Sequence, residues 1–187
     1  LIDRGEIDKN RFIEILKKAD FNIEGVQIRK DDTEDNLRLV HMGPYGALMD
    51  DIPFKSESLG TQRYFELAGI LYLLIVHPCS FAIDEIESSI HPDLVKHFLL
   101  SFCTNAGDSQ IIVTTHVREL LNDKDIFRSD IICFTEKDEA FETKVYKLSD
   151  FGTDVVRNTS SVLNAYNAGK LGALPRLSDY FLDLKEE

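Results

Sequence analysis

Two adjacent carboxylates, Asp84 and Glu85, follow a short apolar stretch at residues 81–83. The stretch is typical of a buried strand, so the two side chains would lie at its end and on opposite faces. A carboxylate at position 84 can reach a Mg²⁺ ion on nucleotide phosphates. One at position 85 can orient a water molecule for attack on the terminal phosphate. Ile83 and Ile86 flank the pair, which argues against a solvated turn and favours phosphoryl-transfer chemistry.

Two further segments could take part in the same chemistry. Residues 57–63, Glu-Ser-Leu-Gly-Thr-Gln-Arg, open a predicted helix, and a helix N-terminus with small residues is an anion site. The apolar stretch 111–113 ends in two threonines and His116, which is 31 positions beyond Glu85. That separation accommodates the helix and strand that a parallel crossover needs. Simpler interpretations remain open here: Ser58 could merely cap a helix, and His116 could be structural.

The elements that must position these residues follow from hydrophobic periodicity and from helix and strand breakers. The order strand, helix, strand in the middle of the chain predicts a parallel sheet with helices packed on it. The expected helices are 10–19, 61–76, 92–104, 162–166 and 177–184; the expected strands are 21–28, 37–42, 79–83 and 110–114, with a β-hairpin formed by 131–135 and 141–148 and a loop or hairpin tip at 41–51.

Taken together, the three segments resemble the C-terminal half of an ABC-type ATPase. The likeness is greatest to the prokaryotic AAA family ATP-binding proteins related to the OLD and SMC-like ATPases. It extends over nearly the whole chain and is strongest from Glu57 to His116. It implies an α/β, P-loop NTPase-like fold, with a parallel sheet core flanked by helices and an added β-hairpin, and a single domain over residues 1–187.

The resemblance also implies roles for individual residues. Ser58 and Gly60 fall in the signature motif (57–63), which in this family binds the γ-phosphate of a nucleotide held by the other subunit. Asp84 and Glu85 complete the Walker B segment (81–85), as the Mg²⁺ ligand and the catalytic carboxylate. His116 is expected to be the switch histidine that contacts the γ-phosphate and orients the water.

The chain departs from the family pattern in two places. His91 stands where transporter-type ATPases have the aspartate of the D-loop, which leaves open how that loop contacts a second subunit. No G-x-x-x-x-G-K-[ST] motif is present, since Gly169-Lys170 is followed by Leu171, and no glutamine loop is recognisable. In the family both lie upstream, and the chain starts with Leu1 rather than Met. We therefore expect it to be part of a longer protein and to bind nucleotide weakly by itself.

Bulk properties limit the remaining possibilities. The net charge of −12 argues against direct nucleic-acid binding by this chain. Widely spaced cysteines without a C-x-x-C pair favour a reducing, cytoplasmic setting, and the longest apolar stretch, 70–76, is too short to span a bilayer. The histidines other than His116 have no metal-site spacing: His41, His77, His91 and His97.

The expected function is ATP binding and hydrolysis at a dimer interface, with ATP and Mg²⁺ as cofactors. The expected partners are a second copy in an ATP sandwich, an upstream Walker A lobe, and an effector such as a nuclease or toxin. Relatives suggest anti-phage defence or genome maintenance. The alternative is a non-hydrolysing scaffold or regulatory module with an ATPase-like fold; the presence of Asp84, Glu85 and His116 argues against it.

Overall fold

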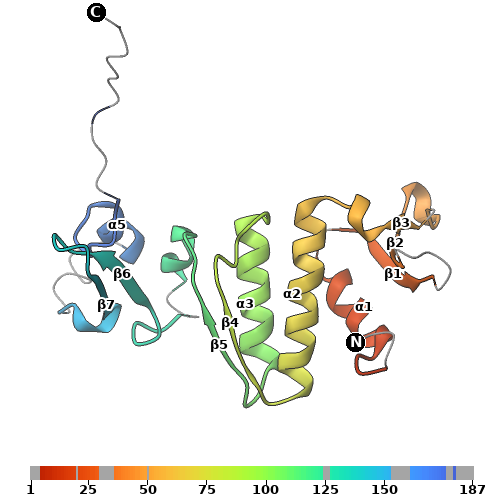
Figure 1. Cartoon of the computed structure of the whole chain (residues 1–187), viewed down its shortest axis with the longest axis horizontal. Helices are drawn as coiled ribbons and strands as arrows, with labels where there is room; N and C mark the ends of the chain where they lie inside the picture. The colour runs from red at the N-terminus through yellow and green to blue at the C-terminus, as the bar shows by residue number, and fades with distance from the viewer. Residues whose placement is uncertain are drawn as a thin grey trace, which may run out of the picture. The chain divides into compact units, whose positions relative to one another are not determined.

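The computed structural model describes residues 5–19, 21–29, 36–49, 51–123, 127–152, 161–175 and 179. The chain divides into two units, Leu1–Val117 and Arg118–Glu187 (Figure 1). The predicted carboxylates, histidine and signature segment all belong to the first unit.

The first unit begins with a helix and a small antiparallel sheet. The Asp8 carboxylate caps the helix by accepting the N–H groups of Asn10 and Arg11. The sheet has the order β1-β2-β3. Apolar side chains from the helix and both long strands pack with Tyr64 in one core. These elements are α1 (Lys9–Lys17), β1 (Ile23–Ile28), β2 (Leu37–His41) and β3 (Ile52–Pro53).

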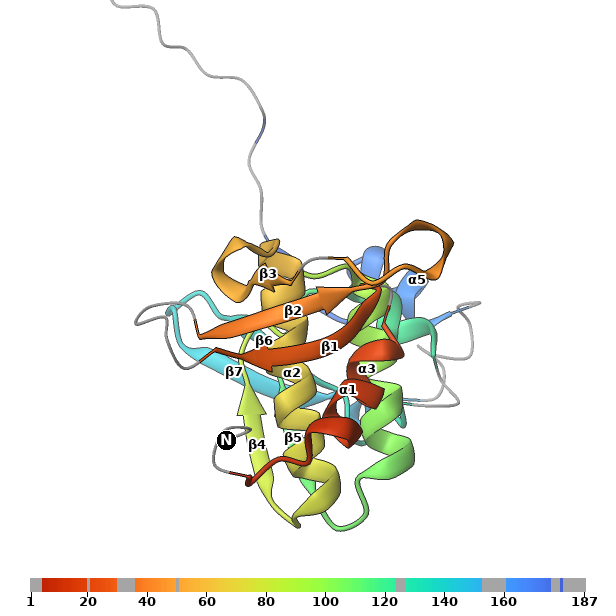
Figure 2. The ribbon, with the colours of Figure 1, turned by 90° about the vertical axis from the view of Figure 1, so that its right-hand side faces the viewer.

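The rest of the first unit is a parallel strand pair with two helices. The elements are α2 (Leu59–Val76), β4 (Ser80–Ile83), α3 (Pro92–Asn105) and β5 (Gln110–Val113). Figures 1 and 2 show α2 between the antiparallel sheet on one side and α3 on the other. The parallel pairing of β4 with β5 confirms the predicted α/β architecture.

Burial along the parallel pair alternates, because helices cover one face only within the described residues. Ile83 is buried, whereas Ala82 is exposed and 71% of Ile112 is accessible. An apolar run in a parallel strand predicts burial on both faces. The second face is uncovered in the part of the first unit that the structure describes.

The second unit contains the predicted hairpin. β6 (Cys133–Lys137) pairs antiparallel with β7 (Thr143–Lys147), and η3 (Arg118–Asn122), η4 (Leu148–Asp150) and α5 (Val162–Asn167) accompany it. Phe134 and Leu148 pack with Val162, Ala165 and Leu171 in its core. The helix expected at 177–184 lies outside the described residues. Among the described helices, none is both long enough and apolar enough to cross a membrane.

Candidate functional site

The site lies at the carboxyl edge of the parallel pair. Ile83 pairs with Val113, so Asp84 and Thr114 follow their strands side by side. The Thr114 N–H donates to the Ile83 carbonyl (3.0 Å), and the Ile86 N–H donates to the Thr114 carbonyl (3.1 Å). These bonds continue the sheet past its last paired residues and fix the turn that carries the carboxylates. Figure 1 shows that β4 and β5 end on the side of the unit where α2 and α3 begin.

Thr114 orients both predicted carboxylate positions through one hydroxyl. Its Oγ1 accepts the Glu85 N–H at 2.8 Å and donates its own hydrogen to Asp84 Oδ1. Glu85 has a φ of +45°, a left-handed conformation that is rare outside glycine and concentrates at functional sites. Both acidic side chains are exposed at this edge. The structure therefore holds the Glu85 backbone and the Asp84 side chain while leaving both residues accessible to a ligand.

Glu87 joins the carboxylate turn to the segment that carries His116. Its Oε1 accepts the N–H of His116. Partial burial opposes ionisation of Glu87, but hydrogen bonds from the His116 N–H and the Thr115 hydroxyl outweigh it, so the pKa of Glu87 lies below its ordinary value. Through this bond, the exposed His116 is brought to the same edge as Asp84 and Glu85.

Ser58 caps α2, which is the simpler of the two roles that the sequence left open for this residue. Its Oγ accepts the Thr61 N–H at 3.1 Å and lies 2.8 Å from Thr61 Oγ1. The residue is exposed, and the first amides of an 18-residue helix follow it. Capping uses a lone pair of the hydroxyl oxygen, and when the Thr61 hydroxyl donates to Ser58 Oγ, the Ser58 hydrogen stays free to be donated to an anion. Capping and anion binding are therefore chemically compatible at this position.

Gly60 explains how the signature segment meets the carboxylate turn. A Cβ at this position would lie 2.9 Å from the carbonyl oxygen of Ser89, closer than real contacts of this kind. Glycine is therefore required for the first turn of α2 to pack against the turn that follows Asp84 and Glu85. Ser89 itself has a φ of +65°. The structure thus brings the predicted signature segment into contact with the loop after β4 within one chain.

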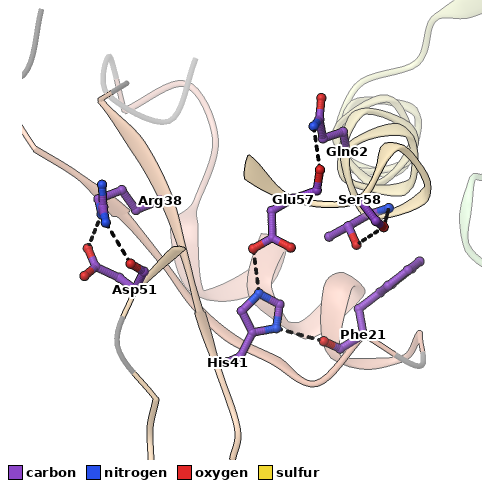
Figure 3. A network of polar contacts seen from close by, with 8 residues as sticks. Phe21, Arg38, His41, Asp51, Glu57, Ser58 and Gln62 are labelled. Carbon is purple, nitrogen blue, oxygen red and sulfur yellow. Dashed lines mark hydrogen bonds and ion pairs between the residues drawn. The ribbon is translucent and has the colours of Figure 1, made fainter. Parts of the chain in front are cut away.

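A polar network lies immediately before α2 and includes a histidine to which sequence analysis gave no role (Figure 3). His41 Nε2 lies 2.7 Å from Glu57 Oε1, and its Nδ1 lies 3.1 Å from the Phe21 carbonyl. Glu57 precedes Ser58 directly. A separate pair in the same sheet joins Arg38 to Asp51, at 2.6 Å. The sequence offered no periodic signal for the His41 contact, because the partners are 16 positions apart.

The acidic groups of the site do not form a protein-only metal cage. Among the described residues, no group of three or more His, Cys, Asp or Glu side chains could hold a metal ion. Mg²⁺ is commonly bound by one or two carboxylates together with substrate phosphates and water. The exposed Asp84 carboxylate fits that kind of site, in which the nucleotide supplies further ligands.

Comparisons with known proteins identify the family and the fold of the chain. A family model described as "AAA domain, putative AbiEii toxin, Type IV TA system" matches residues 10–122. No match among curated proteins was found.

Two solved structures are similar at TM-scores of 0.52. One, from work titled "Structural biochemistry of ATP-driven dimerization and DNA stimulated activation of SMC ATPases", is 20% identical and aligns with 74% of this chain and 81% of its own. The other, an SMC head bound to the C-winged helix domain of ScpA, is 18% identical and aligns with 81% of this chain. The chain spans 44% of that head. These matches confirm the predicted fold class, the fold of SMC-type ATPase heads.

Proposed function

We propose that this chain is the C-terminal half of an ATP-hydrolysing, SMC-like ATPase. The chain belongs to the AAA-domain family just described. In this proposal Asp84 binds Mg²⁺ on the nucleotide and Glu85 orients the attacking water. His116 contacts the γ-phosphate from the neighbouring strand end. Ser58 and Gly60 present the start of α2 to a nucleotide held by a second copy.

The observation that carries the proposal is the shared position of three groups at one sheet edge. Asp84 and Glu85 are held by the hydroxyl of Thr114, and the His116 backbone is held by Glu87. A metal ligand, a general base and a phosphate contact are the parts that phosphoryl transfer to water requires. A solvated turn would not need its amides tied to a strand end 29 positions away.

The nucleotide and metal fit this chain's residues in part. Asp84 supplies an oxygen ligand of the kind Mg²⁺ prefers, and the bound ion would neutralise charge on the phosphates. The backbone cradle and lysine that grip the phosphates have no match in the sequence. We therefore assign the grip to an upstream Walker A lobe. The exposed face of β4 and β5, which includes Ile112, is a surface that such a lobe would cover.

The proposal extends to assembly and setting. Two copies would enclose two ATP molecules, each contacted by Ser58 of the opposite copy, and hydrolysis would separate them. The coupled effector would be a nuclease or toxin. The family description, which names a toxin–antitoxin system, supports a defence role more than one in genome maintenance.

The test is Mg-ATP hydrolysis by the longest natural polypeptide that contains these 187 residues. Glu85→Gln keeps the shape of the side chain and removes the base, so turnover should fall by about 10²-fold or more. The same variant should accumulate as an ATP-bound dimer, and Glu139→Gln, an exposed position in the hairpin turn, should hydrolyse at the wild-type rate. Undiminished turnover in Glu85→Gln would show that the assignment of Glu85 is wrong.

The second candidate is a non-hydrolysing scaffold, favoured by one observation: the phosphate-gripping motif has no match in these residues. Equilibrium binding of ATP to the same polypeptide distinguishes the scaffold from the ATPase. A scaffold would show neither turnover nor ATP-dependent dimerisation.

A further inference from the structure

His41 stands at the end of β2 with both ring nitrogens engaged. Nδ1 faces the Phe21 main-chain oxygen at 3.1 Å, and Nε2 faces Glu57 Oε1 at 2.7 Å (Figure 3). Only 15% of the His41 side chain and 8% of the Glu57 side chain are accessible. The pair is thus largely withdrawn from water, where a charge-assisted hydrogen bond is stronger and less screened.

The two partners of the ring are both acceptors. A main-chain carbonyl has no hydrogen to give, and an ionised carboxylate only accepts. A ring nitrogen can bond to either partner only by donating a hydrogen, so the hydrogen-bonding capacity of His41 is directed at the Glu57 carboxylate and the Phe21 carbonyl. The contact joins the Phe21 main chain and β2 to the residue that precedes Ser58.

Glu57 is held at all three of its polar groups. Its carboxylate accepts from His41, and its carbonyl accepts from the Gln62 side chain at 2.8 Å. Its N–H donates to the Phe54 carbonyl at 3.1 Å. The direction in which the chain enters α2 is consequently fixed on the sheet side. On the other side it is fixed by the fit of Gly60 against Ser89.

We propose that His41, acting through Glu57, is a positioning residue that aims the Ser58–Gly60 turn at the nucleotide of a second copy. This inference rests on the proposed function. His41 touches no reacting group in the proposal; it holds the turn whose hydroxyl and amides make the contact between copies.

The overall fold does not depend on this pair, which makes the role testable. β2 is held by its register with β1 from Leu37 to His41, and α2 is anchored by Leu67, Leu71 and Leu74 in the core. Loss of His41 should therefore alter the entry to α2 more than the secondary structure around it.

The experiment uses the longest natural polypeptide containing this chain, with Glu85→Gln added wherever dimers are to be trapped. His41→Ala should weaken ATP-dependent dimerisation, measured by sedimentation, and lower kcat by about tenfold or more, as expected for loss of a hydrogen bond to a charged group. ATP affinity measured at protein concentrations below the dimerisation range should stay within about twofold of wild type, because His41 is proposed to act only between copies. His41→Gln, which keeps a donor toward Glu57, should recover most of the loss.

A double-mutant cycle shows whether His41 acts through Glu57. If it does, His41→Ala and Glu57→Ala combined should cost no more than the larger single change. Arg38→Ala is the matched control, because it removes an ion pair on the same strand and the Arg38 guanidinium bonds to Asp51 rather than to the entry of α2. It should leave dimerisation and kcat unchanged.

The outcomes separate the two hypotheses. A wild-type protein without ATP-driven dimers or turnover would overturn the proposed function and this inference with it. An active wild type whose His41→Ala variant dimerises normally would overturn the inference alone. Equal losses in Arg38→Ala, or full additivity with Glu57→Ala, would also overturn it. If circular dichroism shows His41→Ala to be unfolded, the decision rests on Glu57→Ala, which removes the acceptor for Nε2 and should weaken ATP-dependent dimerisation, whereas normal dimerisation of this variant would overturn the inference.

Discussion

The turn after β4 and the turn after α5 are both stabilised by side-chain hydrogen bonds to the backbone, but they differ in which polar groups remain accessible. In the first, Thr114 and Glu87 hold backbone amides by side-chain hydrogen bonds. In the second, Glu136 accepts the Ala173 N–H, while the Tyr146 hydroxyl donates to the Leu171 carbonyl. Both turns contain non-glycine residues with positive φ, Glu85 and Ala173.

The two turns differ in which side chains remain accessible to a ligand once the backbone is held. The supports of the first turn are Thr114 and Glu87, so the Glu85 carboxylate is exposed and has no hydrogen-bond partner among the described residues. In the second turn the Glu136 carboxylate is itself the support, and the tyrosine hydroxyls are engaged with carbonyls. Strained backbone and polar contacts therefore do not by themselves indicate a catalytic site, and the two turns differ in whether an acidic side chain stays accessible to a ligand.

The strongest test of this contrast removes the support of the first turn. Thr114→Val keeps the side-chain shape but deletes the acceptor for the Glu85 N–H and the donor to Asp84. Turnover of the longest natural polypeptide should fall by about 10- to 100-fold, because each lost or unpaired polar group costs about 1–3 kcal/mol. Steady-state hydrolysis measures the effect.

Two matched variants serve as controls for the Thr114→Val measurement. Thr114→Ser retains the hydroxyl and should keep most of the activity, and Thr104→Val, on the exposed side of α3, should keep all of it. Equal activity of Thr114→Val and wild type would mean that the hydroxyl does not organise the site.

The second unit offers the converse test, in which a substitution should change the free energy of unfolding but not ATP turnover. Gly172 has a φ of +67°, and an added Cβ would lie 2.7 Å from Glu136 Oε2 and also close to the Tyr146 hydroxyl. Gly172→Ala should lower the free energy of unfolding by about 1–3 kcal/mol through strain and crowding. Denaturant unfolding followed by fluorescence of the tyrosines would measure it.

Gly152→Ala is the matched change in the same unit, since nothing lies within 4 Å of its added Cβ. It should leave the free energy of unfolding within about 0.5 kcal/mol of wild type. If ATP turnover falls in Gly172→Ala while the protein is still fully folded, the turn after α5 takes part in function and the contrast is wrong.

Much of the scaffold could be predicted because its signals are local. The apolar run of α2, which was expected to end at residue 76, and the polar ends of β4 and β5 predicted a parallel pair with acids at its edge. The structure confirms those elements, with α2 starting at Leu59 rather than at the expected residue 61 because Ser58 caps it.

The supports of the site could not be predicted in the same way. Thr114 meets Glu85, Glu87 meets His116, and His41 meets Glu57 across 29, 29 and 16 positions. Which amide or carboxylate a polar side chain reaches depends on strand register and helix packing, which hydrophobic periodicity does not specify. The exposed outer face of β4 and β5 could not be predicted for a similar reason. An apolar strand predicts that both of its faces are buried, but it does not indicate which chain segment covers them.

The smallest expected effect concerns the charge of Glu87. Its pKa lies below the ordinary value of 4.5, because hydrogen bonds to the ionised form outweigh the opposing effect of burial. A carboxylate whose pKa is lowered by folding stabilises the native state above its unfolded pKa, and that contribution is lost as pH falls through the folded pKa. Glu87→Gln keeps an acceptor for the His116 N–H, removes the charge and replaces the second carboxylate oxygen with an NH2 group. It should therefore be less stable than wild type by about 1 kcal/mol or less at about pH 7.

Unfolding by urea at a series of pH values would measure that difference. The gap between wild type and Glu87→Gln should stay constant from about pH 7 to about pH 5 and then close as the pH is lowered further. Titrating groups that do not interact with Glu87 contribute equally to both proteins and cancel in the difference. A gap that persists at the lowest pH would mean that the Glu87→Gln change costs shape or packing rather than charge. The link between the Glu85 turn and His116 would then depend on the fit of the side chain and not on its ionisation.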